Sequence, residues 1–267
     1  MLRPFHKMHG LGNDFVVIDA RALPVEMDST LARALADRRT GVGCDQLILL
    51  ERSAAADVKM RVFNADGSEV GACGNAARCI VLLTGPVRIE TDGGLIDGGK
   101  ADDEVEVAMG EPRFEWETIP LAYAMDTAAL PMAWDALESP MALNVGNPHL
   151  VFFVDNVSAV PLDELGPRIE HDAAFPERIN VNVASVGDDG ITLRTWERGA
   201  GLTLACGTGA CATAVAAIAS KRATSPVQVT MPGGALTIGW VPGSPILMRG
   251  PATHVFDGMI DLDALRP

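Results

Sequence analysis

Basic residues are scarce in this chain of 267 residues. It has 21 Lys and Arg against 35 Asp and Glu, which gives a formal net charge of −14. A chain of this charge repels the phosphates of nucleic acids and of anionic lipids. The basic residues that it has are scattered along the sequence. We therefore expect neither a nucleic-acid partner nor a membrane partner.

The sequence also lacks an export signal and a convincing membrane span. Residues 1–7 contain no apolar stretch followed by a small-residue cleavage site. The uncharged segment 199–220 is interrupted by glycines and threonines and is too weakly apolar to cross a bilayer. We expect a cytoplasmic protein.

The cysteine pattern excludes two further classes. An odd number of cysteines in a long chain without an export signal argues against a disulfide framework. No C-x-x-C pair occurs, so we expect no metal site. Cysteine chemistry must therefore be sought at single positions, which are Cys44, Cys73, Cys79, Cys206 and Cys211.

What the chain does contain is an internal duplication. A shift of 133 residues places Ala72-Cys73-Gly74-x-x-Ala77 over Ala205-Cys206-Gly207-x-x-Ala210 without a gap. At nearly the same offset, segment 12–17 matches 146–151, and segment 87–95 matches 227–236. Matches in one order indicate a repeat. We predict two copies of one α+β unit, joined near residues 113–120.

Each copy predicts a strand, a turn and a helix, with a cysteine before the helix. Segments 58–63 and 191–196 alternate like half-buried strands, and segments 75–83 and 208–220 are rich in alanine. A helix N-terminus has unpaired N–H groups and the positive end of the macrodipole, which stabilise an anion. We therefore expect the pKa of both Cys73 and Cys206 to be lowered. The same N–H groups can hold a substrate carboxylate.

Two thiols at equivalent points of a repeat suit the inversion of a carbon centre. One thiolate removes a Cα proton from one face while the opposite thiol donates a proton to the other face. Fixed dipoles in a dry site stabilise the carbanion between these steps. A single cysteine is more often an inert buried residue, and we assign that role to Cys44, Cys79 and Cys211. Only their pairing favours catalysis by Cys73 and Cys206.

Seven motifs resemble the diaminopimelate epimerase family, in order and over most of the chain from Lys7 to Asp257. They are Lys7-Met8-His9-Gly10-Leu11-Gly12-Asn13-Asp14-Phe15, Gly41-Val42-Gly43-Cys44-Asp45-Gln46, Phe63-Asn64-Ala65-Asp66-Gly67-Ser68-Glu69, Cys73-Gly74-Asn75, Gly146-Asn147-Pro148-His149, Glu177-Arg178-Ile179-Asn180-Val181, and Glu197-Arg198-Gly199-Ala200-Gly201 leading to Ala205-Cys206-Gly207-Thr208-Gly209. The chain departs from the family at Ala76, where glycine is usual, and in a shortened segment 79–89.

The resemblance implies a cofactor-independent epimerase that interconverts LL- and meso-2,6-diaminopimelate for lysine and peptidoglycan synthesis, without a metal. Cys73 and Cys206 match its acid–base pair, and His149 matches a histidine near the catalytic centre. The positions that match its substrate-binding residues are Asn13, Gln46, Asn64, Gly74, Asn75, Asn147, Asn180, Glu197, Arg198, Gly207 and Thr208. It also implies a homodimer.

For the fold, we expect an α+β protein with two pseudo-symmetric lobes. Each lobe is a mixed β-sheet or barrel around a central helix, and the active site lies in the cleft between them. The first lobe takes residues 1–116 with the C-terminal strand at about 255–267, and the second takes residues 117–254.

Two alternatives stay open from the residues. A proline racemase or hydroxyproline epimerase would share the architecture, but it has no use for Arg198 and the set of asparagines. A thiol redox protein would use Cys73 and Cys206 as a switchable disulfide. It would catalyse no hydrogen exchange at a substrate Cα.

Overall fold

The computed structural model describes residues 2–71 and 73–266. The chain folds into two compact units, one of Met1–Ala108 with Gly250–Pro267 and one of Met109–Arg249. The predicted lobe boundaries, at 116/117 and 254/255, lie eight and five residues later along the chain than the divisions between these units. No helix among the described residues is long and apolar enough to span a membrane.

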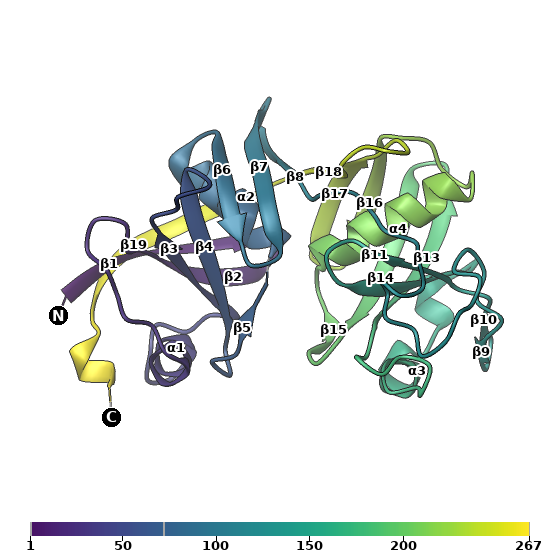
Figure 1. The fold of residues 1–267 in the computed structure, drawn as a ribbon, viewed down its shortest axis with the longest axis horizontal. Helices are drawn as coiled ribbons and strands as arrows, with labels where there is room; N and C mark the ends of the chain where they lie inside the picture. The colour runs from purple at the N-terminus through teal and green to yellow at the C-terminus, as the bar shows by residue number, and fades with distance from the viewer. Residues whose placement is uncertain (1, 72, 267) are drawn as a thin grey trace. The chain divides into compact units, whose positions relative to one another are not determined.

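The first unit contains nine strands and two α-helices among the described residues. Its elements are β1 (Leu2–Gly10), β2 (Asn13–Asp19), α1 (Ser29–Ala36), β3 (Gln46–Glu51), β4 (Val58–Asn64), β5 (Glu69–Val70), α2 (Gly74–Thr84), β6 (Val87–Thr91), β7 (Gly94–Ala101), β8 (Glu104–Ala108), β19 (Thr253–Asp261) and the 3-10 turn η2 (Asp263–Leu265). The C-terminal β19 pairs antiparallel with β1, and Figure 1 shows yellow β19 running beside purple β1.

The second unit is built from the middle of the chain. Its elements are β9 (Ala133–Trp134), β10 (Leu137–Glu138), β11 (Met141–Asn144), β12 (Pro148–Phe153), η1 (Val157–Ala159), α3 (Leu162–Glu170), β13 (Asn180–Gly187), β14 (Gly190–Glu197), β15 (Gly201–Thr203), α4 (Gly207–Ala219), β16 (Val227–Met231), β17 (Gly234–Gly239) and β18 (Leu247–Gly250). Its apolar core is centred on Trp134, Phe152 and Phe175, with Trp134 edge-on to Phe152.

The duplication is visible in the strand pairing. In the first unit β2 pairs parallel with β3, β3 antiparallel with β4, β4 parallel with β6, and β6 antiparallel with β7. In the second unit β12, β13, β14, β16 and β17 repeat these four pairings in the same directions. The predicted α+β repeat is therefore confirmed.

A buried helix lies at the centre of each unit. Residues 74–81 of α2 are buried, and the helix contacts β1, β6, β7, β8 and β19. In α4 ten of the thirteen residues are buried, and most of these are alanine or glycine, whose small side chains let the strands approach closely. Gly85, with φ of 85°, ends α2 two residues earlier in its unit than α4 ends, in agreement with the shortened segment seen in the sequence.

The two copies differ in polarity beneath these helices. His149 on β12 and Asn182 on β13 are buried, and Asn182 lies opposite Thr195 on β14. The equivalent positions of the first unit are Phe15, Ile48 and Val62, with Ile48 opposite Val62. One copy of the repeat therefore has a polar layer where the other has an apolar one.

Candidate active site

Cys73 occupies the N-cap of α2 and has an extended backbone, with φ of −144°. Its side chain is half-buried, and its Sγ lies 4.0 Å from Oδ1 of Asn13. The side-chain amide of Asn75 donates to the same Oδ1 at 3.2 Å. The structure thus brings three predicted site residues together at the start of one helix. The N–H groups of Gly74 and Asn75, in the first turn, have no partner within α2.

Two charged groups that the sequence analysis missed orient these amides. Nη2 of Arg78, a fully buried side chain, donates to Oδ1 of Asn75 at 2.9 Å. Oδ2 of Asp45 accepts from Nδ2 of Asn13 at 3.2 Å. An arginine among small and apolar residues in the sequence of a helix is itself a signal. If that helix is buried, the charged group needs a partner.

Gln46 and Asn64 form a second pair in the first unit. They are opposite each other in the β3–β4 register, and Nε2 of Gln46 donates to Oδ1 of Asn64 at 2.9 Å. Asn64 in turn donates to Oγ of Ser68 at 3.1 Å. Oε1 of Gln46 is buried and has no hydrogen-bond partner among the described residues. That oxygen is an acceptor available to a ligand that carries an N–H donor.

In the second unit, Cys206 occupies the N-cap of α4. Its Sγ accepts from the backbone N–H of Gly209 at 3.3 Å and lies 3.5 Å from Oγ1 of Thr208. Burial raises the pKa of this thiol well above its ordinary value, the charge of Glu197 raises it further, and the contacts with Thr208 and Gly209 lower it only in part. The expected lowering of the pKa at a helix N-terminus is therefore wrong for Cys206, because desolvation outweighs the helix end.

Glu197 and Arg198 lie side by side at the end of β14. Burial raises the pKa of Glu197, and Oγ1 of Thr203 donates to its carboxylate at 2.5 Å. The backbone N–H of Arg198 donates to Oδ1 of Asn180 at 2.9 Å, and its guanidinium donates to the carbonyl of Glu177 at the same distance. Asn180 thus holds the backbone at Arg198, from which the side chains of Glu197 and Arg198 extend.

The buried His149 belongs to a chain of polar contacts that reaches Cys206 through the half-buried Asn147 and Thr208. Its Nε2 lies 2.8 Å from Oδ1 of Asn147, whose Nδ2 donates to Oγ1 of Thr208 at 3.3 Å. Its Nδ1 lies 3.0 Å from Nδ2 of Asn182. Burial lowers the pKa of His149 to about 3, with the charge of Arg198 adding to the effect, so the ring is neutral.

Asn182 sets the tautomer of this ring. Its Oδ1 accepts from Oγ1 of Thr195 at 3.0 Å and its Nδ2 donates to the carbonyl of Leu150 at 2.8 Å, which turns Nδ2 toward the imidazole. Nδ1 of His149 then accepts, so the hydrogen is on Nε2 and points at Asn147. The sequence signal for Asn182 was available: it is two residues after Asn180, on the same face of a buried strand.

We expect Asn182→Asp to move that hydrogen. A carboxylate accepts only, so Nδ1 of His149 must become the donor and the pKa of the ring must rise. Imidazole ¹⁵N chemical shifts should show the exchange of tautomers or protonation of the ring. Loss of the donor to Leu150 should lower the free energy of unfolding by about 1–3 kcal/mol.

The matched control for this substitution is Asn156→Asp. Asn156 is an exposed cap that accepts from the N–H of Ser158, a contact that a carboxylate keeps. The imidazole ¹⁵N spectrum of Asn156→Asp should equal that of the wild type. An unchanged His149 spectrum in Asn182→Asp would contradict the assigned tautomer.

The buried carboxylate of Glu170 binds the residues on either side of Glu197 and Arg198. Glu170, the last residue of α3, accepts from Nε1 of Trp196 at 2.8 Å and from the backbone N–H of Gly199 at 2.9 Å. Its side chain is almost fully buried. Glu170 was missed because its partners are 26 and 29 residues away in the sequence, and no local pattern connects them.

Comparison with known proteins identifies the relatives of this chain. The family model described as diaminopimelate epimerase matches residues 5–115 and 141–255. The diaminopimelate epimerase of Rhizorhabdus wittichii is 70% identical over 263 residues, which cover 97% of this chain and 96% of that protein. The protein of the same name from Sphingopyxis alaskensis is 64% identical over 259 residues, which cover 96% and 97%.

The solved structures show the same fold at much lower identity. A hydroxyproline epimerase from Agrobacterium vitis, with bound trans-4-hydroxy-L-proline, superposes with a TM-score of 0.69 at 14% identity, covering 97% of this chain and 92% of that one. Identity this low supports the architecture alone.

Proposed function

Because the chain belongs to the diaminopimelate epimerase family, we propose that it interconverts LL- and meso-2,6-diaminopimelate with Cys73 and Cys206 as the two acid–base groups. The observation that carries this proposal is the equivalent placement of the two thiols. Each is the N-cap of the buried helix of its unit, at the same point of a repeated fold. The proposal requires the two units to present these thiols to opposite faces of one bound carbon.

The reaction conserves atoms and electrons without a further reactant. A thiolate takes the Cα proton and becomes a thiol, and the electron pair of the broken C–H bond stays on Cα. The opposite thiol gives its proton to the other face of Cα and becomes a thiolate. The product leaves with inverted configuration, and the two sulfurs have exchanged protonation states. Backbone N–H groups at the two helix N-termini stabilise the negative charge that develops on the substrate carboxylate.

We propose that Cys206 is the protonated sulfur before the substrate binds. Burial and the nearby Glu197 raise its pKa, so Cys206 holds its proton at neutral pH. A protonated Cys206 is the proton donor of the first turnover, which leaves Cys73 as the base. The contacts from the neutral His149 through Asn147 to Thr208 support the orientation of Cys206, and burial raises the pKa of the neighbouring Glu197.

The remaining binding roles follow from the groups that each unit offers. Diaminopimelate has two ammonium and two carboxylate groups, and the guanidinium of Arg198 suits a carboxylate as a bidentate partner. The oxygens of Glu197 and Gln46 suit the ammonium groups. We propose as substrate contacts Asn13, Gln46, Asn64, Gly74, Asn75, Asn147, Asn180, Glu197, Arg198, Gly207 and Thr208.

Incubation with LL-diaminopimelate in deuterium oxide tests the proposal. Deuterium should enter one Cα of the substrate as the meso isomer forms, because solvent-derived hydrogen on one sulfur reaches the carbon. Mass spectrometry and chiral chromatography follow both events together. Isotope entry without added pyridoxal phosphate or metal is expected.

Two parallel incubations separate this proposal from the alternatives. With L-proline or trans-4-hydroxy-L-proline in place of diaminopimelate, no Cα exchange should occur. A thiol redox protein would show no exchange with any of the three amino acids. Exchange with a proline substrate alone would overturn the assigned substrate and keep the assigned chemistry.

The assembly and location of the protein are part of the same proposal. We expect a homodimer, as the family resemblance implies, and light scattering coupled to size-exclusion chromatography measures it. We place the protein in the cytoplasm because the proposed chemistry needs Cys73 and Cys206 as thiols, and a reducing compartment keeps them so.

A further inference from the structure

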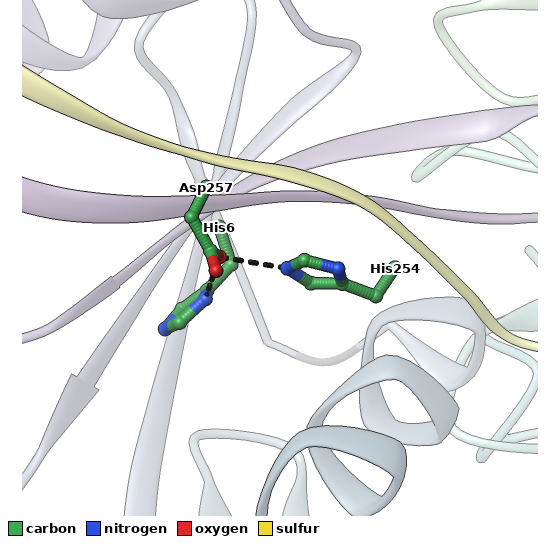
Figure 2. A group of neighbouring side chains, drawn as sticks. All are labelled: His6, His254 and Asp257. Carbon is green, nitrogen blue, oxygen red and sulfur yellow. Dashed lines mark hydrogen bonds and ion pairs between the residues drawn. The ribbon is translucent and has the colours of Figure 1, made fainter.

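Two histidines and an aspartate form a cluster on β1 and β19 of the first unit. Nδ1 of His6 and Nε2 of His254 lie 2.6 Å and 2.7 Å from the same atom, Oδ1 of Asp257. The three ligand atoms lie within 4.8 Å of one another, and this is the one such group of three among the described residues. Figure 2 shows both rings directed at the carboxylate.

A β-bulge creates this arrangement. His6 is directly opposite Asp257 in the register, so their side chains share a face of the sheet. His254 is three residues before Asp257, and in a regular strand that spacing would place it on the other face. The register shifts between Lys7 and Met8, which pair with Phe256 and His254. The extra residue, Val255, restores His254 to the face of Asp257, as bulges do where a side chain is re-aimed.

We propose that His6, His254 and Asp257 bind a divalent zinc ion at the surface of the first unit. Two imidazole nitrogens and one carboxylate oxygen are a ligand set that Zn²⁺ accepts, and a fourth, tetrahedral position is left for water. Each neutral ring would bind the ion through the nitrogen that faces Asp257 and carry its hydrogen on the other ring nitrogen. The side chains are 28%, 37% and 65% exposed, so an ion reaches them directly from solvent.

Stability alone gives no reason for this cluster. An ion pair between exposed groups contributes about 0–1 kcal/mol, so each of the two contacts adds little to stability. Here two rings converge on one oxygen, and a bulge is required to bring the second ring there. The sequence shows no metal motif because His6 and His254 are 248 residues apart and only the β1–β19 pairing joins them. The cluster shares no residue with the sites described around Cys73 and Cys206.

Zinc titration of the full chain by isothermal titration calorimetry tests the site. The wild type should bind one Zn²⁺ that His254→Ala and Asp257→Asn do not. Loss of even an outer partner of a ligand costs about 10- to 100-fold in metal affinity, so loss of a ligand should weaken binding by more than about tenfold. All variants keep the five cysteines, so zinc bound by thiols contributes equally to each titration.

The matched control is His171→Ala, another exposed histidine, whose Nδ1 contacts the carbonyl of Pro167 within α3. It should bind zinc like the wild type. Co²⁺ gives a second measurement, because nitrogen and oxygen ligands produce only weak visible bands whereas thiolates add intense charge-transfer bands. The proposal is overturned if His254→Ala and Asp257→Asn bind zinc as the wild type does, or if the Co²⁺ bands that these variants lose are those of thiolates.

Discussion

Cys73→Ala and Cys206→Ala should each lower kcat/KM for diaminopimelate by at least about 10³-fold. A positioned acid or base contributes about 10²- to 10⁴-fold, and in the proposed mechanism each sulfur carries the proton for one face of the carbon. Epimerisation assays from LL- to meso-diaminopimelate and in the reverse direction measure the loss. Neither substitution should unfold the chain, because each cysteine is an N-cap whose removal affects one helix end.

Cys44→Ala and Cys211→Ala are the matched controls. Both cysteines are buried core residues, and we assign neither a part in proton transfer. They should keep near wild-type kcat/KM at a temperature where the variants remain folded. Full activity in Cys73→Ala or Cys206→Ala would contradict the two-base mechanism. Equal losses of activity in the controls would show that the assay reports a loss of stability.

The free energy of unfolding should fall steeply as the pH rises above the ordinary pKa of cysteine. Burial raises the pKa of Cys44 to about 11 and of Cys79 to about 12, and it raises that of Cys206 as well. Above about pH 8.5 the unfolded chain loses these protons while the folded chain keeps them, so alkali favours unfolding. From about pH 7.5 to about pH 9.5 each such thiol costs about 1.4 kcal/mol, or about 3 kcal/mol for Cys44 and Cys79 together.

Urea unfolding at the two pH values measures this loss. Cys79→Ala supplies the internal comparison, because it removes one thiol and should reduce the fall in stability by about 1.4 kcal/mol. Any loss of stability that Cys79→Ala causes at both pH values cancels, because only the change in the free energy of unfolding between the two pH values is compared. An identical fall in Cys79→Ala and wild type would show that the Cys79 thiol ionises equally in both states.

The sequence predicted the parts of this molecule that depend on local pattern and on the repeat. The strands at 58–63 and 191–196 and the helices at 75–83 and 208–220 are present with ends shifted by one residue or so. Both cysteines are where alternation and alanine content placed them. The repeat carried this prediction, because a pattern found twice at one offset is hard to produce by chance.

The contacts that join distant strands were not predictable in the same way. Glu170 receives its hydrogen bonds from 26 and 29 residues away, and His254 meets His6 only through β19. The pKa of Cys206 was predicted in the wrong direction because sequence reveals a helix end but not how deeply that end is buried. Desolvation is a property of the packed molecule and has no local signature.

The unequal layers beneath the two central helices have a consequence for how the repeat diverged. A chain made of two first units would keep both sulfurs, both N-caps and the four strand pairings that the two units share. Under its second sulfur it would have phenylalanine, isoleucine and valine in place of His149, Asn182 and Thr195. Duplication alone would therefore place the two cysteines in identical surroundings. His149, Asn182 and Thr195 help to make the surroundings of Cys206 unlike those of Cys73, and the proposed reaction needs two sulfurs that differ in protonation state on opposite faces of one carbon.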